Sequence, residues 1–521
     1  MANKTLFQSI RQRLQNTDRR NNAGGAAYAT SSKHALAQFA ATGCFNTTFY
    51  TAANHQLDEV KRLCEDVDPE FIAKTALFAR QRGYMKDMPS LLVAVLSVKS
   101  PGLMAEVFDR VIDNGRMLRN FVQIMRSGTV GRKSLGTLPK RMILQWMENR
   151  SDAQLFAASV GAAPSIADII KMTHPCPKTK SREALFAYLL GREFDKKELP
   201  QVVREYEQFK HNPTAKVPDV PFQMLTSMQL KAKHWKKIAR NAGWQMTRMN
   251  LNTFQRHGVF ENDEMIGVVA NRISSKKLIR KSRVFPYQLM VAYANADKQI
   301  PKPIVNALQD AMEVALQNVP KIEGRVFVFP DVSGSMHSPI TGYRPGSTST
   351  VRCIDAAALL SAAILRKNRT AEVIPFETDV VSVRLNPRDS VITNANRLAS
   401  LPCGGTNCSA PLKYLNRNYR QGDLIIYISD NESWIDSRQY GYFGGGRTET
   451  LKAWDVFKKR CPKAKMICID IQPNSHTQAK ERDDIFNVGG FSDQVFQLIS
   501  DVSKGNTGKD HWVNSIELIT I

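Results

Sequence analysis

Asp331, Ser333 and Ser335 are the residues of this chain whose types and spacing point most directly to chemistry. They form an Asp-x-Ser-x-Ser turn directly after the apolar run 326–329. One carboxylate and two hydroxyls around a common point make a hard, oxygen-only set of ligands, which suits Mg²⁺ or another hard divalent cation. The turn therefore predicts a divalent-cation site.

Two further segments could complete this site. The turn Gly404-Gly405-Thr406-Asn407 precedes a helical pattern and can deliver the Thr406 hydroxyl, and Asp430 follows the apolar run 424–429. In an open α/β sheet, ligands bind beyond the carboxyl ends of the parallel strands, so these loops are expected to converge. The ligands are few and mostly neutral. They would leave water molecules and one open position, which a carboxylate or phosphate of a partner could fill.

Enzymatic interpretations of the same turn are weaker. A phosphotransferase with an Asp nucleophile would need a second carboxylate two residues on, where Ser333 stands, and a metal-dependent nuclease or phosphatase would also need one near Asp331. The sequence has no GxxxxGK[ST] phosphate loop and no Gly-x-Ser-x-Gly elbow. Cys403 and Cys408 flank the Gly-Gly-Thr turn, where small buried thiols are a commoner explanation than catalysis. We therefore expect no enzyme.

The elements that must position the cation site follow Pro320. Short apolar runs alternate there with helical patterns, which predicts a doubly wound, mostly parallel α/β sheet. The expected strands are 326–329, 372–376, 380–385, 424–429 and 466–471, and the expected helices are 351–367, 409–416, 449–459 and 492–502.

The residues before Pro320 show helical periodicity without strand alternation. Asp68-Pro69-Glu70, for example, provides an N-cap, a proline at the first helical position and an acid in the first turn. The expected helices are 68–83, 89–99, 100–114, 116–126, 138–149, 165–172, 182–190, 196–210, 245–257, 285–296 and 303–318. Such helices favour stacked pairs of a diverged HEAT-like array, an α-solenoid, with a plain helical bundle as the alternative.

The charge of the chain is concentrated in this helical part. The whole chain of 521 residues carries a net charge of +24. From Lys321 onward it has 25 Lys+Arg and 21 Asp+Glu, so the residues before Lys321 carry a net charge of +20. This asymmetry points to a polyanionic partner, either nucleic acid or an acidic membrane surface.

Basic residues of the helical part form four clusters with glycines and aromatic residues. The clusters contain Arg80, Arg82, Tyr84 and Lys86; Arg126, Arg132 and Lys133 with Lys140 and Arg141; Lys171 and His174 with Lys178, Lys180 and Arg182; and the segment 231–237 with Trp235. One such cluster is usually a solvated face, and His174 alone fits a helix-terminal histidine better than a catalyst. Four clusters with aromatics able to stack on bases favour nucleic acid, bound through phosphates with steep salt dependence.

The cysteine pattern and the lack of long apolar runs indicate where in the cell the protein is expected. None of the eight cysteines forms a CxxC pair, the start of the chain has no apolar h-region, and no run approaches the roughly 18 apolar residues of a membrane span. A reducing cytoplasm with free thiols and no membrane partner is therefore expected.

The two parts of the chain resemble known modules. The C-terminal part resembles a von Willebrand factor A domain with its metal-ion-dependent adhesion site, carried by Asp331, Ser333, Ser335, Thr406 and Asp430. The N-terminal part resembles the TROVE module of the Ro autoantigen family, of a bacterial type. The matching stretches are 39–50 (FAATGCFNTTFY), 118–137 (LRNFVQIMRSGTVGRKSLGT) and 165–177 (SIADIIKMTHPCP), and 488–498 (VGGFSDQVFQL) resembles the closing segment of that family.

This resemblance implies a monomeric ring of HEAT-like helical repeats that is closed by the A domain. It also implies binding of small structured Y RNAs on an outer basic face and of single-stranded 3′ ends of misfolded RNAs in the central hole. The implied role is noncoding-RNA quality control, with a 3′-exoribonuclease of the polynucleotide phosphorylase type as a tethered partner. His174, the basic loop 126–133 and Lys140-Arg141 match family positions, whereas 157–164 lacks basic residues that some animal members carry.

The predicted organisation has four parts. They are a flexible arm over 1–30, a TROVE-like RNA-binding domain over 31–320, an A-like domain over 321–505, and a segment 506–521 that packs back on the ring. A second hypothesis, from another class, is a metal-dependent protein-interaction module whose basic helical domain binds an acidic protein or a membrane.

Overall fold

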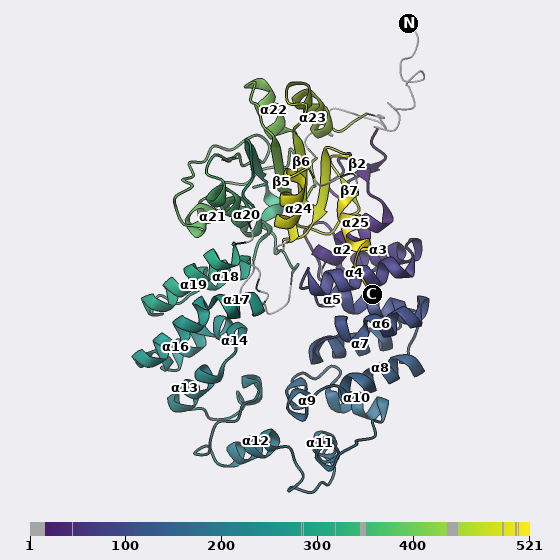
Figure 1. Ribbon diagram of the computed structural model, residues 1–521, viewed down its shortest axis with the longest axis vertical. Helices are drawn as coiled ribbons and strands as arrows, with labels where there is room; N and C mark the ends of the chain where they lie inside the picture. The colour runs from purple at the N-terminus through teal and green to yellow at the C-terminus, as the bar shows by residue number, and fades with distance from the viewer. Residues whose placement is uncertain are drawn as a thin grey trace. The chain divides into compact units, whose positions relative to one another are not determined.

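The computed structural model describes residues 16–43, 45–282, 284, 286–317, 319–343, 351–434, 446–491, 494–505, 508 and 510–521 (Figure 1). The chain divides into two compact units, which are described separately. The first unit comprises Met1–Met88, Phe285–Val291 and Ala315–Thr520, and the second comprises Pro89–Val284 and Ala292–Val314.

The first unit is built around a five-stranded sheet in which all neighbouring strands are parallel. Its order is β4 (Glu372–Val373), β3 (Val326–Pro330), β5 (Leu424–Ser429), β6 (Lys465–Asp470) and β8 (Ile485–Gly489). In register, Val328 lies opposite Ile426, which lies opposite Ile467. Every residue of β3 and β5 is buried, as is typical of strands covered on both faces. The predicted parallel α/β sheet is confirmed.

Helices cover both faces of this sheet. On one face, Phe327 and Tyr427 form a core with α22 (Ala410–Arg417) and α23 (Glu449–Arg460). Because side chains alternate along a strand, Val328 points to the other face. There α20 (Cys353–Lys367) packs on β3 and α24 (Gln494–Ser503) on β6, while α21 (Val391–Ala399) lies beside α20 (Figure 1).

The first residues of the chain belong to this unit. Residues 1–15 of the predicted flexible arm lie outside the described residues, but the prediction is wrong for 16–30. There β1 (Arg19–Arg20) and β2 (Ala26–Ala29) form a three-stranded sheet with β7 (His476–Thr477). Tyr28 is fully buried, and its hydroxyl accepts a hydrogen bond from the Thr448 amide at 3.2 Å. Burial of a large aromatic side chain holds this segment in place.

Four helices join the sheet in the first unit: α2 (Ser32–Thr42), α3 (Ala53–Asp66), α4 (Pro69–Gln81) and α25 (His511–Glu517). Helix α2 packs on the edge strand β8, and Gln38 Nε2 donates to the Gln472 carbonyl at 2.9 Å. A covered edge cannot pair with another chain. The C-terminal helix α25 packs on α2 and α4, with the Trp512 ring edge-on to His34.

The remaining helices lie between Asp87 and Ala315 (blue to teal in Figure 1). They are α5 (Asp87–Lys99), α6 (Pro101–Val111), α7 (Gly115–Ser127), α8 (Thr137–Glu148), α9 (Asp152–Ala158), α10 (Ile166–Thr173), α11 (Lys180–Leu190), α12 (Gln201–His211), α13 (Ala232–Asn241), α14 (Trp244–Met249), α15 (Leu251–Arg256), α16 (Asp263–Ser274), α17 (Lys276–Ser282), α18 (Pro286–Ala294) and α19 (Lys302–Ala315). Side chains cap many of them, and Ser165 forms a capping box with Asp168 at the start of α10. The predicted all-helical region is confirmed.

Several predicted elements have different bounds. The helix expected at 196–210 begins at Gln201, because Pro200 occupies its N-cap position. The helix expected at 245–257 is interrupted at Asn250, which separates α14 from α15. The strand expected at 380–385 does not form, and only a bridge between Phe376 and Val380 is present there. Residues 285, 318, 492 and 493, at predicted helix ends, lie outside the described residues.

Candidate metal site and nucleic-acid interface

The Asp-x-Ser-x-Ser turn begins where β3 ends. The Asp331 amide donates to the Ile428 carbonyl at 2.9 Å and so extends the pairing of β3 with β5 by one residue. The Ser333 amide then donates to Oδ1 of Asp331 at 2.8 Å, which folds the turn back on its own carboxylate. A short 3₁₀ turn, Gly334–His337, follows and contains Ser335. The two serine hydroxyl oxygens lie 3.3 Å apart.

Two other loops meet this turn. The Ser429 hydroxyl, at the end of β5, donates to Oδ2 of Asp331 at 2.6 Å, and Asp430 is the next residue. The Gly334 amide donates to the Gly404 carbonyl at 2.9 Å, which holds the loop that carries Thr406. The three loops named from the sequence therefore meet at the carboxyl ends of β3 and β5. Cation binding by their five side chains stays a prediction.

The electrostatics of the site fit a divalent cation. Burial raises the pKa of Asp331, against hydrogen bonds from Ser333 and Ser429. Burial also raises the pKa of Asp430 well above its usual range, and the negative charges of Asp331 and Glu432 raise it further. A bound cation would supply the positive charge that two buried carboxylates need. The donor set of Asp331, Ser333, Ser335, Thr406 and Asp430 is all oxygen and fits Mg²⁺.

No group of three or more His, Cys, Asp or Glu side chains that could hold a metal occurs among the residues that the structure describes. A cation at this site would therefore depend on the serine and threonine hydroxyls. Such a site offers a hard cation few charges and leaves water in its coordination shell.

Sequence reasoning missed a buried polar group beside the cation site. Glu432 lies two residues after Asp430, and its Oε1 is 3.1 Å from Nε2 of buried His476. Asn22 Nδ2 donates to the same carboxylate oxygen at 2.7 Å, so the N-terminal hairpin is fixed here. Burial raises the pKa of nearby Asp470 well above its usual value. The contacts come from three distant segments, and no local pattern indicates them.

Three of the predicted basic segments lie close together in the second unit. Helix α10 packs on both α7 and α8. Hydrogen bonds from Ser165 lower the pKa of Asp168, and the positive charges of Lys171, in the last turn of α10, and Arg126, at the end of α7, lower it further. The Lys133 side chain lies near Gly128, in the loop that joins α7 to α8. We define the α7–α10 cationic group as Arg126, Arg132, Lys133, Lys140, Arg141, Lys171 and His174.

The cations of this group differ from those of the sheet domain. In the described part of the chain, none of its lysines and arginines has a carboxylate within ion-pair distance. Cations of the first unit are commonly paired, as Arg352 is with Asp355 at 2.6 Å and Lys413 with Glu449 at 3.0 Å. The α7–α10 group therefore presents positive charge that the protein itself does not neutralise.

The other predicted RNA-binding residues lie in the first unit. Arg80, in α4, donates from Nη1 to the Met85 carbonyl at 3.2 Å, which fixes the turn after the helix. Arg82 and Lys86 are exposed on this turn.

Some clustered residues have structural roles. Trp235 is buried and stacks on His257 at a centroid distance of 4.2 Å, so the expectation that it could stack on bases is wrong. Arg182 donates to the Met147 and Arg150 carbonyls and pairs with Asp152, which ties α11 to the end of α8. His174 caps α10 in the left-handed conformation with φ 52°, as expected for a helix-terminal histidine.

Comparisons with known proteins agree with both units. Residues 325–503 match the family model of the Ro60 vWA domain, and residues 214–315 match that of the TROVE domain. The chain is 23% identical to the RNA-binding protein RO60 of Deinococcus radiodurans over 531 positions, covering 95% of this chain and 97% of the relative.

The chain thus combines a TROVE domain with a Ro60-type vWA domain. The RNA-binding protein RO60 of Caenorhabditis elegans is 23% identical over 258 residues, which is 47% of this chain and 38% of that protein. The crystal structure of the Deinococcus radiodurans RO (RSR) protein superposes with a TM-score of 0.61 at 19% identity, covering 92% of this chain and all of that one. At this identity the superposition shows a shared fold.

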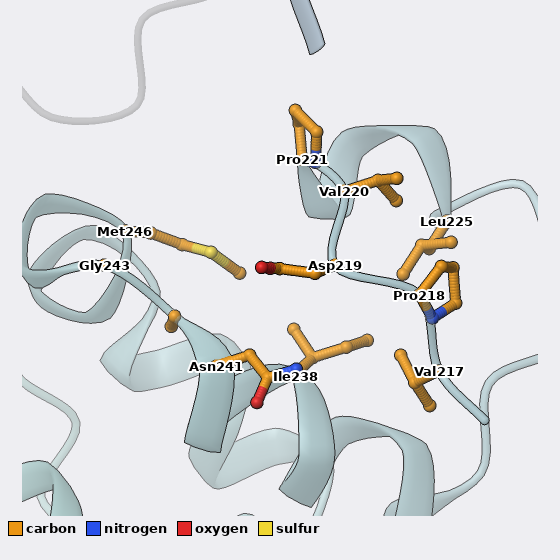
Figure 2. Close-up of a pocket in the computed structure, with 11 residues that line it drawn as sticks. Val217, Pro218, Asp219, Val220, Pro221, Leu225, Ile238, Asn241, Gly243 and Met246 are labelled. Atoms are coloured by element: carbon orange, nitrogen blue, oxygen red, sulfur yellow. The ribbon is translucent and has the colours of Figure 1, made fainter. Parts of the chain in front are cut away.

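The second unit also has a pocket that no sequence pattern indicates. It has a volume of about 250 Å³ and lies in the second unit between the segment 217–221 and the end of α13 (Figure 2). Val217, Pro218 and Ile238 make its lining partly apolar, and Asp219 and Asn241 add polar groups. None of the predicted RNA-binding residues lines it.

The cysteines of this protein are free thiols wherever the structure describes them. Cys408 is buried, as expected, but Cys403 is exposed, so the expectation of two buried thiols is half wrong. Among the described residues, no helix is long and apolar enough to span a bilayer.

Proposed function

We propose that this chain is a non-enzymatic RNA-binding protein of the Ro type. Its ligands would be small, Y-like noncoding RNAs and the single-stranded 3′ ends of misfolded RNAs. It would act in noncoding-RNA quality control in the cytoplasm, or as an adaptor for a processing enzyme such as a 3′-exoribonuclease of the polynucleotide phosphorylase type. The observation that carries the proposal is the unneutralised α7–α10 cationic group. The two relatives, both named RNA-binding proteins, support it.

The physical argument rests on counterion release. Each lysine or arginine that contacts a phosphate releases a cation condensed on the nucleic acid, so affinity falls as salt rises. A lysine or arginine that is already paired with a carboxylate contributes less to RNA affinity, because its ion pair must be broken before it can contact a phosphate. The unpaired cations of α7, α8 and α10 are therefore the expected phosphate contacts, whereas Lys178, paired with Glu148, is not. Such contacts set affinity and carry little sequence information.

The A domain would hold one Mg²⁺ through Asp331, Ser333, Ser335, Thr406 and Asp430. A bound Mg²⁺ would supply a positive charge and directional ligand positions. The chain's own part would be to fix the carboxylate of Asp331 with the Ser333 amide and the Ser429 hydroxyl. The ring predicted from the family resemblance stays a prediction, which small-angle scattering of the pure protein would test.

An electrophoretic titration tests RNA binding. The probe is a structured RNA with a free 3′ single strand, and the competitors are duplex DNA and poly-glutamate. The test variant combines Arg132→Gln, Lys133→Gln and Lys171→Gln, and the matched control is Lys178→Gln. We expect tight binding by the wild type and the control, and a clear loss in the triple variant. Equal affinity for all three polyanions would favour the alternative, a module for acidic protein partners, and overturn the RNA assignment.

Catalysis is tested separately. Pure protein, labelled RNA and Mg²⁺ are incubated together and the RNA is resolved by size. We expect binding without cleavage, because Asp331 and Asp430 are both predicted ligands of one cation and the five predicted ligands hold no second cation for a two-metal attack. Time-dependent shortening of the RNA that Asp331→Ala abolishes would make the protein a nuclease and contradict the proposal.

A further inference from the structure

The five predicted cation ligands have almost no exposed surface. The exposed fractions are 0% for Asp331 and Ser333, 5% for Ser335, 2% for Thr406 and 1% for Asp430. Loops at the carboxyl ends of strands normally face solvent, and an open cation site would leave some ligand surface accessible. Some other part of the chain must therefore cover this site.

Tyr50 lies over the site. It belongs to the segment 45–52, which joins α2 to α3, and so comes from the helical part of the sequence. Its hydroxyl lies beside the Ser335 side chain. Burial raises the pKa of Tyr50, and the negative charges of Asp430, Glu432 and Asp331 raise it further. The phenol is therefore neutral and lies among the carboxylates of the site.

Ser335 is in contact with several groups of the site. Its hydroxyl oxygen lies 3.3 Å from that of Ser333, and its side chain also lies beside the Asp430 carboxylate. Tyr50 therefore contacts a predicted ligand as well as covering it.

The segment that carries Tyr50 is anchored to the A domain. Asn46 Nδ2 donates to the Thr341 carbonyl at 2.8 Å, and the Tyr343 amide donates to the Thr47 carbonyl at 2.8 Å. Gly342, between these two contacts, has φ 69°, and a Cβ atom there would lie 2.7 Å from Asn46 Cβ. Two reciprocal contacts and a close backbone approach fix the segment against the loop after Ser335.

We propose that Tyr50 closes the cation site from within the chain, over the position that an acidic ligand of another molecule would otherwise take. This inference rests on the proposed cation binding. In a site closed in this way, water and the chain's own oxygens complete the coordination of the cation. A carboxylate from a partner reaches it only after the segment 45–52 has been displaced. The metal site then stabilises the packing of the helical part of the first unit on its sheet. It does not serve to bind another molecule.

Luminescence of Tb³⁺ tests the inference in the full-length protein. Tb³⁺ replaces hard divalent cations at oxygen sites, and its emission lifetime shortens with each bound water molecule. Acetate supplies a free carboxylate. In the wild type we expect a lifetime that acetate does not change, because the access route is closed. In Tyr50→Ala we expect a shorter lifetime that acetate lengthens, because carboxylate oxygens replace water on the ion.

Two further variants serve as controls. Tyr50→Phe keeps the ring over the site and removes only the hydroxyl, so it should remain closed to acetate. Tyr419→Ala truncates an exposed tyrosine before the start of β5, at the other end of the strand from the site, and should behave as the wild type.

The outcomes separate the two proposals. If acetate lengthens the lifetime equally in the wild type and in Tyr50→Ala, the site is open and the inference about Tyr50 fails, while cation binding stands. If the wild type shows no bound Tb³⁺ that Asp331→Ala removes, cation binding fails and the inference about Tyr50 fails with it. A lifetime that responds to acetate in Tyr50→Ala alone supports both.

Discussion

The Ser429 hydroxyl donates a 2.6 Å hydrogen bond to Oδ2 of Asp331, and this bond joins the carboxyl ends of β5 and β3. The other oxygen of the same carboxylate accepts from the Ser333 amide at 2.8 Å. Both oxygens of Asp331 are therefore fixed by groups on adjacent strands of one sheet. A carboxylate held in this way needs no rearrangement when a cation arrives, so the site is preorganised by the fold.

Asp331→Ala should abolish cation binding and leave RNA binding unchanged. In the wild type, Mg²⁺ at about 100 times its Kd should add about 2.7 kcal/mol to the free energy of unfolding. The variant should show no such increase, because it lacks a carboxylate of the site. Urea unfolding with and without Mg²⁺ measures the difference, and the electrophoretic titration measures the RNA affinity. A folded variant that no longer binds RNA would contradict the assignment of RNA binding to the helical part.

Lys171→Gln should reduce the salt dependence of RNA binding. Lys171 is exposed in the last turn of α10, and loss of one phosphate contact lowers the slope of log affinity against log salt by roughly one. Lys178→Gln is the control, because Lys178 is already paired with Glu148. Titrations at several salt concentrations give both slopes. Equal slopes for the two variants would show that pairing does not distinguish phosphate contacts from solvated cations.

Elements with strong local signals were predictable from the sequence. The strand 424–429 was predicted with the bounds that β5 has, because six consecutive apolar or small residues are buried on both faces. Helix α4 begins as expected, with the Asp68 carboxylate accepting from the Phe71 amide at 2.8 Å and Pro69 in the first turn. The Asp-x-Ser-x-Ser turn and Asp430 followed from the order of strands alone. In each case the deciding residues are neighbours in the sequence.

Contacts between distant segments were not predictable. Tyr50 meets Ser335 across nearly three hundred residues, and nothing around Tyr50 distinguishes it from an ordinary loop tyrosine. Strands β1 and β7 have two residues each, which is too short for the alternation of apolar and polar residues in a strand to be recognised. The lysines around Trp235 suggested that its side chain is exposed. In the structure the Trp235 side chain is buried. Tertiary packing decides these positions.

Gly489→Ala should destabilise the first unit. A Cβ atom at Gly489, the last residue of β8, would lie 2.0 Å from Oε1 of Gln38 and force that buried side chain to move. The move would cost the 2.9 Å hydrogen bond from Gln38 to the Gln472 carbonyl, so we expect a loss of about 1–3 kcal/mol in the free energy of unfolding. Urea unfolding measures it.

Gly102→Ala is the matched control for this change. A Cβ atom at Gly102, in α6, meets nothing within 4 Å, so alanine there should be neutral or stabilising by up to about 1 kcal/mol. The double variant Gln38→Ala with Gly489→Ala should lose less than the sum of the single changes. Strict additivity would show that the two residues do not compete for the same space.

His34 and Glu481 should give the first unit two opposing pH dependences. His34 Nδ1 lies 3.6 Å from Glu481 Oε2, an ion-pair distance, but burial lowers the pKa of His34 to about 4 and raises that of Glu481 to about 7. Both groups are therefore neutral in the folded state between these pH values. For His34 the unfolded state binds the extra proton, so stability rises as pH increases from about 4 to 6.5. For Glu481 the folded state binds it, so stability falls from about pH 4.5 to 7.

In the wild type these two slopes nearly cancel between about pH 4.5 and 6.5, because each shift spans a similar range. Glu481→Gln removes the falling slope, so its free energy of unfolding should rise with pH relative to the wild type, by on the order of 3 kcal/mol over the full range. Urea unfolding at a series of pH values tests this. Glu70→Gln, at an exposed position of α4, should follow the wild-type curve. If the Glu481→Gln curve also ran parallel to that of the wild type, the Glu481 carboxyl would be ionised in the folded protein throughout this range, and the neutral pair would not exist.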